Sequence, residues 1–175
     1  ILDVDQKLDV KTTLPVLTIM GGSSGSHRVN MYVKDILPLL LEKFSVIHQV
    51  GDAQEFKDYD VLLEFKNSLD KKMQENYTVL KFIDSKYMGW VYKHTDVFVS
   101  RSGANTVQEL LALSKKAVLI PLSYAGGGEQ LENAKLYAAS GLGTYIEEKY
   151  IQSQKLYNEI LAVFEKHAEK HAAGV

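Results

Sequence analysis

The chain contains no cysteine, so it forms no disulfide and has no thiolate nucleophile or metal ligand. A reducing compartment is compatible with this absence. The formal net charge is only −2, which excludes a broad electrostatic attraction to nucleic acid or to an anionic membrane. No apolar run reaches the roughly 18 residues that a membrane-spanning helix needs, and no signal peptide is apparent. We therefore expect a cytoplasmic protein.

The composition is that of a globular domain with a sizeable core. The chain has 175 residues, of which 46% are hydrophobic and 24% are charged. Short apolar runs that end in glycine, proline or polar residues alternate with stretches of helical spacing, and they predict six strands: 16–20, 44–51, 78–83, 97–99, 117–121 and 144–146. This alternation predicts a single α/β domain with a doubly wound parallel sheet, in which ligands bind at the carboxyl ends of the strands.

The junction that carries most information joins the strand 97–99 to the following helix. Small residues make the turn, and we expect Gly103 to adopt a backbone conformation closed to other residues and to let a ligand approach closely. The first N–H groups of the helix favour an anionic or strongly polar ligand. Glu109 lies one turn along, on the face of Asn105 and Thr106, where its carboxylate could accept hydrogen bonds from two neighbouring hydroxyls.

The same residues have a purely structural interpretation. Thr106-x-x-Glu109 is a capping box, in which the two side chains would bind the first N–H groups of a helix. The residues alone do not decide between a cap and a ligand site.

A second glycine-rich turn, at 21–26, follows the first strand and precedes a helix. This order suits a cradle of backbone N–H groups for a phosphate. The turn has neither the Gly-x-Gly-x-x-Gly dinucleotide pattern nor the lysine of a Walker loop. A tight turn without any ligand is the alternative.

Other polar side chains lie near the predicted strand ends. Gln130 and Asn133 share one helix face and offer both donors and acceptors, as the hydroxyls of a sugar require, although a polar helix start is the alternative. His48 lies inside the second strand, where a packed and hydrogen-bonded imidazole is more usual than a ligand.

No metal site is expected. Asp3-Val4-Asp5 and Asp58-Tyr59-Asp60 match the Asp-x-Asp pattern by which some glycosyltransferases hold a divalent cation, but so short a pattern arises by chance. No histidine pairs with carboxylates at a convincing metal spacing. We accordingly expect no cofactor.

The remaining segments are assigned from spacing. Residues 53–76 predict one or two outer helices, 89–94 a short helix, and 153–170 a final helix with an apolar stripe. Trp90 and Tyr92 in the short helix could be core, surface cover or part of a partner face. Residues 1–14 form a lead segment before a domain at 15–175.

Several motifs together resemble the donor domain of the MurG-type glycosyltransferases, which move N-acetylglucosamine from UDP onto a lipid-linked acceptor. The motifs stand in family order: Gly-Gly-Ser-x-Gly at 21–25, His-Gln-x-Gly at 48–51, Phe-Ile at 82–83, Ser-Arg-x-Gly-Ala-x-Thr-x-x-Glu at 100–109 and Gln-x-x-Asn-Ala at 130–134. The resemblance runs from about 15 to about 146. It implies a Rossmann-like domain corresponding to the carboxyl-terminal half of a two-domain GT-B enzyme of the peptidoglycan-precursor type.

The resemblance also implies a role for each matching residue. The diphosphate would lie near Ser23, Ser24 and Gly25, the uracil at Ile83, the sugar and phosphates along Ala104, Asn105 and Thr106, the ribose on Glu109, and the sugar hydroxyls on Gln130 and Asn133. The chain departs from the family pattern in five places, two of which are Thr95 in place of alanine and Lys115-Lys116 in place of the usual residue-Pro. Glu129 replaces a glutamine, a triple glycine precedes it, and two extra residues precede Met88.

By the same resemblance, the transfer is inverting and independent of a metal, and its base and lipid-acceptor groove belong to an amino-terminal domain. No such domain precedes Pro15, so we name no catalytic residue in this chain and expect it to bind UDP-N-acetylglucosamine while turning over little or nothing. Peripheral association with the cytoplasmic face of a membrane would come only through the missing part.

Three accounts of this missing part stay open. The chain could be a domain of a full-length transferase or a natural short subunit completed by a membrane-bound partner. It could also be a nucleotide-binding scaffold without chemistry. No partner of nucleic-acid type is expected.

Overall fold

The computed structural model describes residues 6–21, 26–122 and 128–166. The chain divides into two compact units, Ile1–Asp96 and Val97–Val175. The first contains β1 (Val16–Met20), α1 (His27–Leu41), β2 (Ser45–Gln49), α2 (Asp58–Ser68), α3 (Lys71–Asn76), β3 (Tyr77–Leu80) and α4 (Ser85–His94). The second contains β4 (Val97–Ser100), α5 (Ala104–Ala112), β5 (Ala117–Leu119), α6 (Glu129–Ala139), β6 (Thr144–Tyr145), the 3-10 helix η2 (Glu148–Tyr150) and α7 (Ser153–Glu165).

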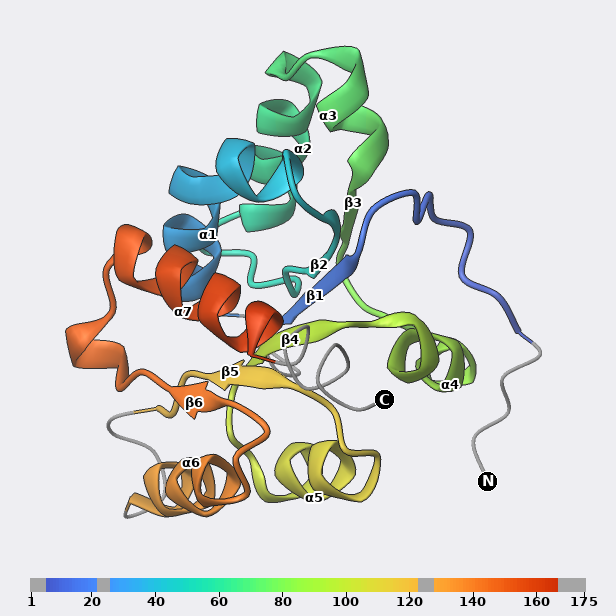
Figure 1. The fold of residues 1–175 in the computed structure, drawn as a ribbon. Coiled ribbons are helices and arrows are strands. Elements are labelled where there is room, and N and C mark those ends of the chain that lie inside the picture. The colour runs from blue at the N-terminus through green and yellow to red at the C-terminus, as the bar shows by residue number, and fades with distance from the viewer. Residues whose placement is uncertain (1–5, 22–25, 123–127, 167–175) are drawn as a thin grey trace. The chain divides into compact units, whose positions relative to one another are not determined.

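The strands of the first unit are parallel and lie in the order β3-β2-β1. Leu17 pairs with Val46 and Ile47 with Thr78, so each strand advances in step with its neighbour. Figure 1 shows α1 and α2 on one side of these strands and α4 on the other. A strand covered on both faces needs apolar residues at successive positions, which is the pattern of 16–20.

The core of the first unit is mainly aliphatic and also contains buried aromatic residues. The stripe of α1 packs against β2, and the fully buried side chains include Leu17, Ile19, Val33, Leu37, Leu40, Phe44, Ile47, Leu62 and Tyr77. Trp90 and Tyr92 on α4 are also buried, which decides between the alternatives left open for them: they belong to the core.

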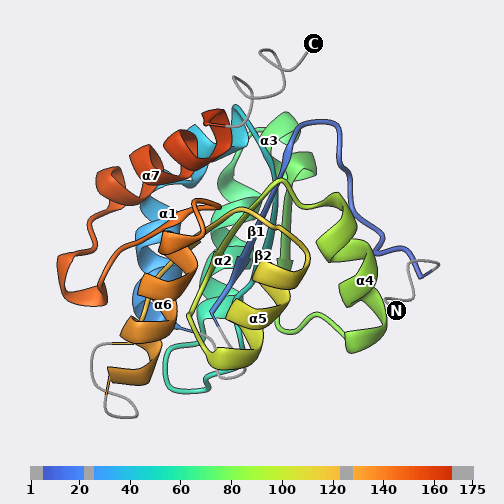
Figure 2. The ribbon, with the colours of Figure 1, turned by 60° about the horizontal axis from the view of Figure 1, so that its bottom comes forward.

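The second unit has the same plan, with parallel strands in the order β4-β5-β6. Helices α5 and α6 lie side by side on one face of these strands, and α7 packs on the opposite face against β4 and β5 (Figures 1 and 2). The turn before β6 passes unusually close to β5. A Cβ added at Gly143 would lie 1.9 Å from the carbonyl oxygen of Ala117.

The predicted elements are all present, but their ends differ. The second, third and fifth strands are shorter than predicted, because the chain leaves the ladder at Gln49, Leu80 and Leu119. Helix α4 begins at Ser85 rather than at Gly89, since Asp84 caps it by accepting from the N–H of Lys86 at 3.1 Å. Helix α7 ends at Glu165, and residues 167–170 of the predicted helix lie outside the described residues.

Candidate functional site

The β4–α5 turn places small residues at the carboxyl end of β4, as the sequence predicts. Its backbone differs from the prediction: Gly103 has φ −61° and ψ 151°, an extended conformation that any residue adopts. The predicted special conformation of Gly103 is therefore wrong. Among the described residues, no atom lies within 4 Å of a Cβ added there, so the glycine leaves open space above the turn.

Helix α5 begins one residue after the turn and carries four of the predicted site residues. Gly103 is its N-cap, and Ala104 is its first helical residue. Thr106 is consequently the third helical residue and cannot be the cap, so the capping-box interpretation is wrong. Asn105 and Glu109 are exposed, while Ala104 and Thr106 are partly exposed. A four-residue spacing places Asn105 and Glu109 on one face.

The start of α6 is held against this turn by hydrogen bonds. Ser102 is buried, and its hydroxyl donates to the carbonyl oxygen of Gln130 at 2.7 Å. Asn133 Nδ2 donates to the carbonyl oxygen of Ser102 at 3.1 Å, and Gln130 Oε1 accepts from the N–H of Leu122 at 3.1 Å. Gln130 Oε1 and Asn133 Nδ2 thus bind the backbone of the second unit. The other polar atom of each amide, Gln130 Nε2 and Asn133 Oδ1, takes no part in these two bonds. The structure brings Gln130, Asn133 and the β4–α5 turn together within the second unit.

Ile83 follows β3 in the first unit and is partly buried. Its N–H donates to Gln49 Oε1 at 3.0 Å. This hydrogen bond to the Gln49 side chain, at the end of β2, uses a backbone donor of the residue predicted to contact uracil. A base that binds at Ile83 through this N–H has to displace the Gln49 amide. Ser23, Ser24 and Gly25, the residues predicted near the diphosphate, lie outside the described residues.

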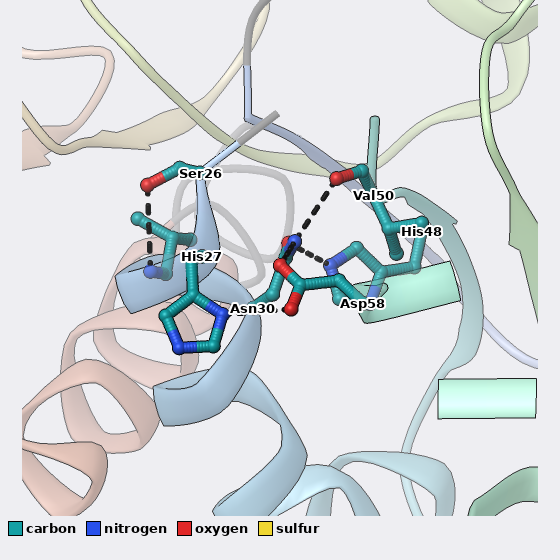
Figure 3. A network of polar contacts seen from close by, with 7 residues as sticks. Ser26, His27, Asn30, His48, Val50 and Asp58 are labelled. Carbon is teal, nitrogen blue, oxygen red and sulfur yellow. Dashed lines mark hydrogen bonds and ion pairs between the residues drawn. The ribbon is translucent and has the colours of Figure 1, made fainter. Parts of the chain in front are cut away.

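A buried polar network joins side chains of α1, β2 and α2 (Figure 3). Asn30 of α1 donates from Nδ2 to Asp58 Oδ2 at 2.7 Å and to the carbonyl oxygen of Val50 at 3.0 Å. Asp58 Oδ1 lies 2.7 Å from His27 Nδ1. Asp58 is therefore a buried carboxylate engaged by two side chains, which disfavours the Asp58-Tyr59-Asp60 pattern as a metal site. The other copy, at residues 3–5, lies outside the described residues.

His48 is a packed histidine, as the usual behaviour of a strand imidazole predicts. It is fully buried, with Nδ1 3.0 Å from the Tyr77 hydroxyl and Nε2 3.0 Å from Asn30 Oδ1. Burial lowers the pKa of His48 from 6.5 to about 3, although Asp58 opposes the shift. The same burial raises the pKa of Tyr77 far above its usual value. Both groups are neutral at physiological pH.

The buried imidazole predicts that stability falls as the pH is lowered below 6.5. Between pH 6.5 and about 3 the unfolded chain protonates His48 and the folded chain does not, so each pH unit costs about 1.4 kcal/mol. From pH 7 to pH 5, we expect His48 to account for about 2 kcal/mol of lost unfolding free energy. Urea melts at both pH values test this, with His48→Gln as the non-titrating comparison. An equal pH slope in the parent and the variant would contradict it.

Arg101 stands within the sequence motif at 100–109 and has a structural role in the fold. Its Nη2 lies 2.7 Å from Glu148 Oε1, and its Nη1 donates to the carbonyl oxygen of Ile120 at 3.1 Å. The Arg101 and Glu148 side chains are only 10% and 8% exposed. Sequence reasoning missed Glu148, because 47 residues separate the partners and no local pattern signals the pair.

A comparison with protein families decides the assignment. The glycosyltransferase family 28 C-terminal domain matches residues 16–174, nearly the whole chain. The chain belongs to this family. The described site residues of the family 28 domain lie at the carboxyl ends of parallel strands within their respective units, where α/β folds bind ligands.

Known family 28 relatives are longer than this chain. The UDP-N-acetylglucosamine--N-acetylmuramyl-(pentapeptide) pyrophosphoryl-undecaprenol N-acetylglucosamine transferase of Clostridium novyi (strain NT) is 37% identical over 158 residues, which cover 89% of this chain and 40% of that protein. The corresponding transferase of Lachnoclostridium phytofermentans is 34% identical over 87% of this chain and 39% of that protein. The chain thus spans about 40% of the length of these relatives.

Solved structures show the fold of the family 28 domain. The crystal structure of Acinetobacter baumannii MurG matches 95% of this chain and 42% of that chain, with a TM-score of 0.63 and 24% identity. This likeness confirms the predicted Rossmann-like α/β fold with six parallel strands, and the family description assigns it to a carboxyl-terminal domain.

Proposed function

We propose that this chain is the donor-binding part of an inverting, metal-independent glycosyltransferase that moves N-acetylglucosamine from UDP-N-acetylglucosamine to a lipid-linked precursor of peptidoglycan. The proposal rests on the β4–α5 junction of this family 28 domain. Glu109 is exposed on α5, and the amides of Gln130 and Asn133 are fixed beside the junction by hydrogen bonds. A carboxylate accepts from vicinal ribose hydroxyls, and primary amides both donate to and accept from sugar hydroxyls.

In the transfer, an acceptor hydroxyl attacks the anomeric carbon of the sugar, the bond from that carbon to the diphosphate oxygen breaks, and UDP leaves with the electron pair. The donor part binds and orients the nucleotide, and backbone N–H groups at helix starts stabilise the charge that develops on the diphosphate. The base that removes the proton of the acceptor belongs to a part of the enzyme outside this chain.

That part would be an amino-terminal acceptor domain or a separate subunit, working at the cytoplasmic face of a membrane. In the described part of the chain, no helix is long and apolar enough to cross a membrane. Contact with a lipid-linked acceptor would then depend on the other part of the enzyme.

Calorimetric titration with UDP-N-acetylglucosamine, UDP-glucose and UDP, with and without magnesium, tests the proposal. We expect binding that does not need magnesium, and Glu109→Ala to weaken it about tenfold, because a carboxylate bonded to hydroxyls contributes about 1.5 kcal/mol or more. Glu165→Ala, an exposed glutamate on α7, is the matched control and should bind like the parent. Absence of any UDP-sugar binding, or an unchanged Glu109→Ala variant, would refute the proposed donor site.

A further inference from the structure

A cavity of about 300 Å³ lies within the second unit, between α7 and the turn that joins α6 to β6. Its walls come from the residue before β5, the end of α6, the turn at 141–143, the start of β6 and the carboxyl-terminal half of α7. A volume of this size is at the lower end of the range found for small-molecule sites in proteins. The cavity therefore suits a small organic ligand.

The cavity lies away from the proposed donor site. Lys116 directly precedes β5 and Gly143 directly precedes β6, so both line the cavity at the amino-terminal ends of these strands. Strands β4, β5 and β6 are parallel, and the β4–α5 junction lies at the carboxyl end of β4. The cavity and the junction are thus at opposite ends of the strands of the second unit.

Two glycines leave the wall of the cavity without side chains. Gly141 follows the end of α6 with φ +77°, and no described atom lies within 4 Å of a Cβ added there. Gly143 passes so close to the backbone of Ala117 that no side chain fits. The turn consequently contributes backbone and the single apolar side chain of Leu142 to the wall.

Two opposite charges line the cavity from α7. Glu159 and Lys166 are seven residues apart, which places them on one face of the helix about 10 Å apart along its axis. An ion pair on a helix surface needs a spacing of three or four residues instead. Within the described part of the chain, neither side chain makes a hydrogen bond or an ion pair. The two charges are therefore available to a ligand that spans the distance between them.

A third charge makes the two ends of the cavity different. Lys116 Nζ donates to the carbonyl oxygen of Phe164 at 3.2 Å, so this ammonium lies at the carboxyl end of α7, where Lys166 is also found. Glu159 lies about two turns earlier. Between these ends, Ala162 and Val163 line the cavity. The cavity thus has a cationic end, an anionic end and an apolar wall.

A small zwitterion with an apolar side chain complements this arrangement. We propose that the cavity binds a free α-amino acid of the size of leucine. Its carboxylate accepts from Lys166 and its ammonium donates to Glu159, while its side chain contacts Leu142 and Val163. Hydrogen bonds of about 2.8 Å at the two ends cover more than half of the spacing along the helix, and the remainder suits a molecule whose own charges lie a few ångströms apart. A dicarboxylate or a diamine would bring a like charge to one end.

Titration of the parent chain with L-leucine, N-acetyl-L-leucine and L-leucinamide tests the proposal. The first derivative has no ammonium and the second has no carboxylate. We expect L-leucine to bind saturably, to shift the backbone amide signals of Gly141 and Gly143 in ¹H–¹⁵N spectra, and to bind about tenfold more tightly than either derivative. The titrations contain no nucleotide, so a failure of the proposed donor site would leave their outcome unchanged.

Variants of α7 then identify which charge binds which group. Glu159→Gln should weaken L-leucine about tenfold and N-acetyl-L-leucine not at all, and Lys166→Met should do the same to L-leucine and L-leucinamide. Lys155→Met and Glu165→Gln are the matched controls, because both residues are exposed on α7 outside the cavity, and they should bind like the parent. A parent that does not bind L-leucine, derivatives that bind as tightly as L-leucine, or equal losses in the controls would overturn the proposal. The derivatives test the parent alone, so the result does not depend on the folding of a variant.

Discussion

Replacing Gly143 by alanine is expected to destabilise the chain strongly. The added Cβ would lie 1.9 Å from the carbonyl oxygen of Ala117 and 3.0 Å from its backbone C and N atoms. Ala117 begins the buried strand β5, whose residues Val118 and Leu119 pair with Thr144 and Tyr145 of β6. A side chain can rotate away from a clash, but a paired strand cannot, so β6 has to detach.

The expected loss is at least about 3 kcal/mol, the upper end of what overpacking usually costs. Urea denaturation at neutral pH measures this loss of unfolding free energy, which should lower the urea concentration at the midpoint of unfolding. Gly103→Ala is the matched control, because Gly103 has an ordinary φ of −61° and open space around its Cβ direction. Its stability should stay within about 0.5 kcal/mol of the parent. A Gly143→Ala protein with the parent's midpoint would contradict the close approach of the two strands.

Breaking the buried pair between Arg101 and Glu148 is expected to cost about 3–5 kcal/mol, because the remaining charge stays buried without its partner. Arg101→Met leaves the Glu148 carboxylate buried without its cationic partner and also removes the hydrogen bond to the carbonyl oxygen of Ile120. A chain of this size should then melt roughly 10 °C lower.

The exposed pair of Lys135 and Glu132 provides the comparison, since its side chains are 49% and 71% exposed. Lys135→Met should leave the unfolding free energy close to that of the parent, because an exposed ion pair contributes little to stability. The double variant Arg101→Met with Glu148→Leu should recover much of the loss, because it leaves no unpaired buried charge. If Arg101→Met alone melts like the parent, the pair contributes nothing to stability.

The order of strands and helices could be predicted from the sequence because each type of element has a pattern of apolar residues within a short stretch of the chain. A run such as 16–20 is apolar at successive positions, and α1 repeats apolar residues at helical spacing. The early start of α4 was missed, although Asp84 is a strong N-cap residue that could have indicated it. The ends of β2 and β3 were not, because a strand ends where its neighbour stops pairing, and pairing is not local.

The candidate site was predicted in outline and not in its contacts. Motif positions placed Gln130 and Asn133 correctly near the start of α6, and Glu109 more than one turn into α5. Both helices follow strands, as parallel α/β topology requires. The bond from Ile83 to Gln49 and the network from Tyr77 to Asp58 join residues 18 to 34 positions apart, and no spacing rule links them. The capping-box alternative for Thr106 was wrong, because the N-cap is Gly103 and its position depends on where the backbone turns.

The buried network from Tyr77 to Asp58 joins four side chains by hydrogen bonds but does not conduct protons. A hydroxyl or an imidazole can accept a proton on one side and release another, but the Asn30 amide cannot do so without becoming an unstable imidic acid. Asn30 therefore blocks proton transfer between the imidazole of His48 and the carboxylate of Asp58. A proton therefore cannot pass along these hydrogen bonds between His48 and Asp58, and the buried His48 and Tyr77 stay neutral.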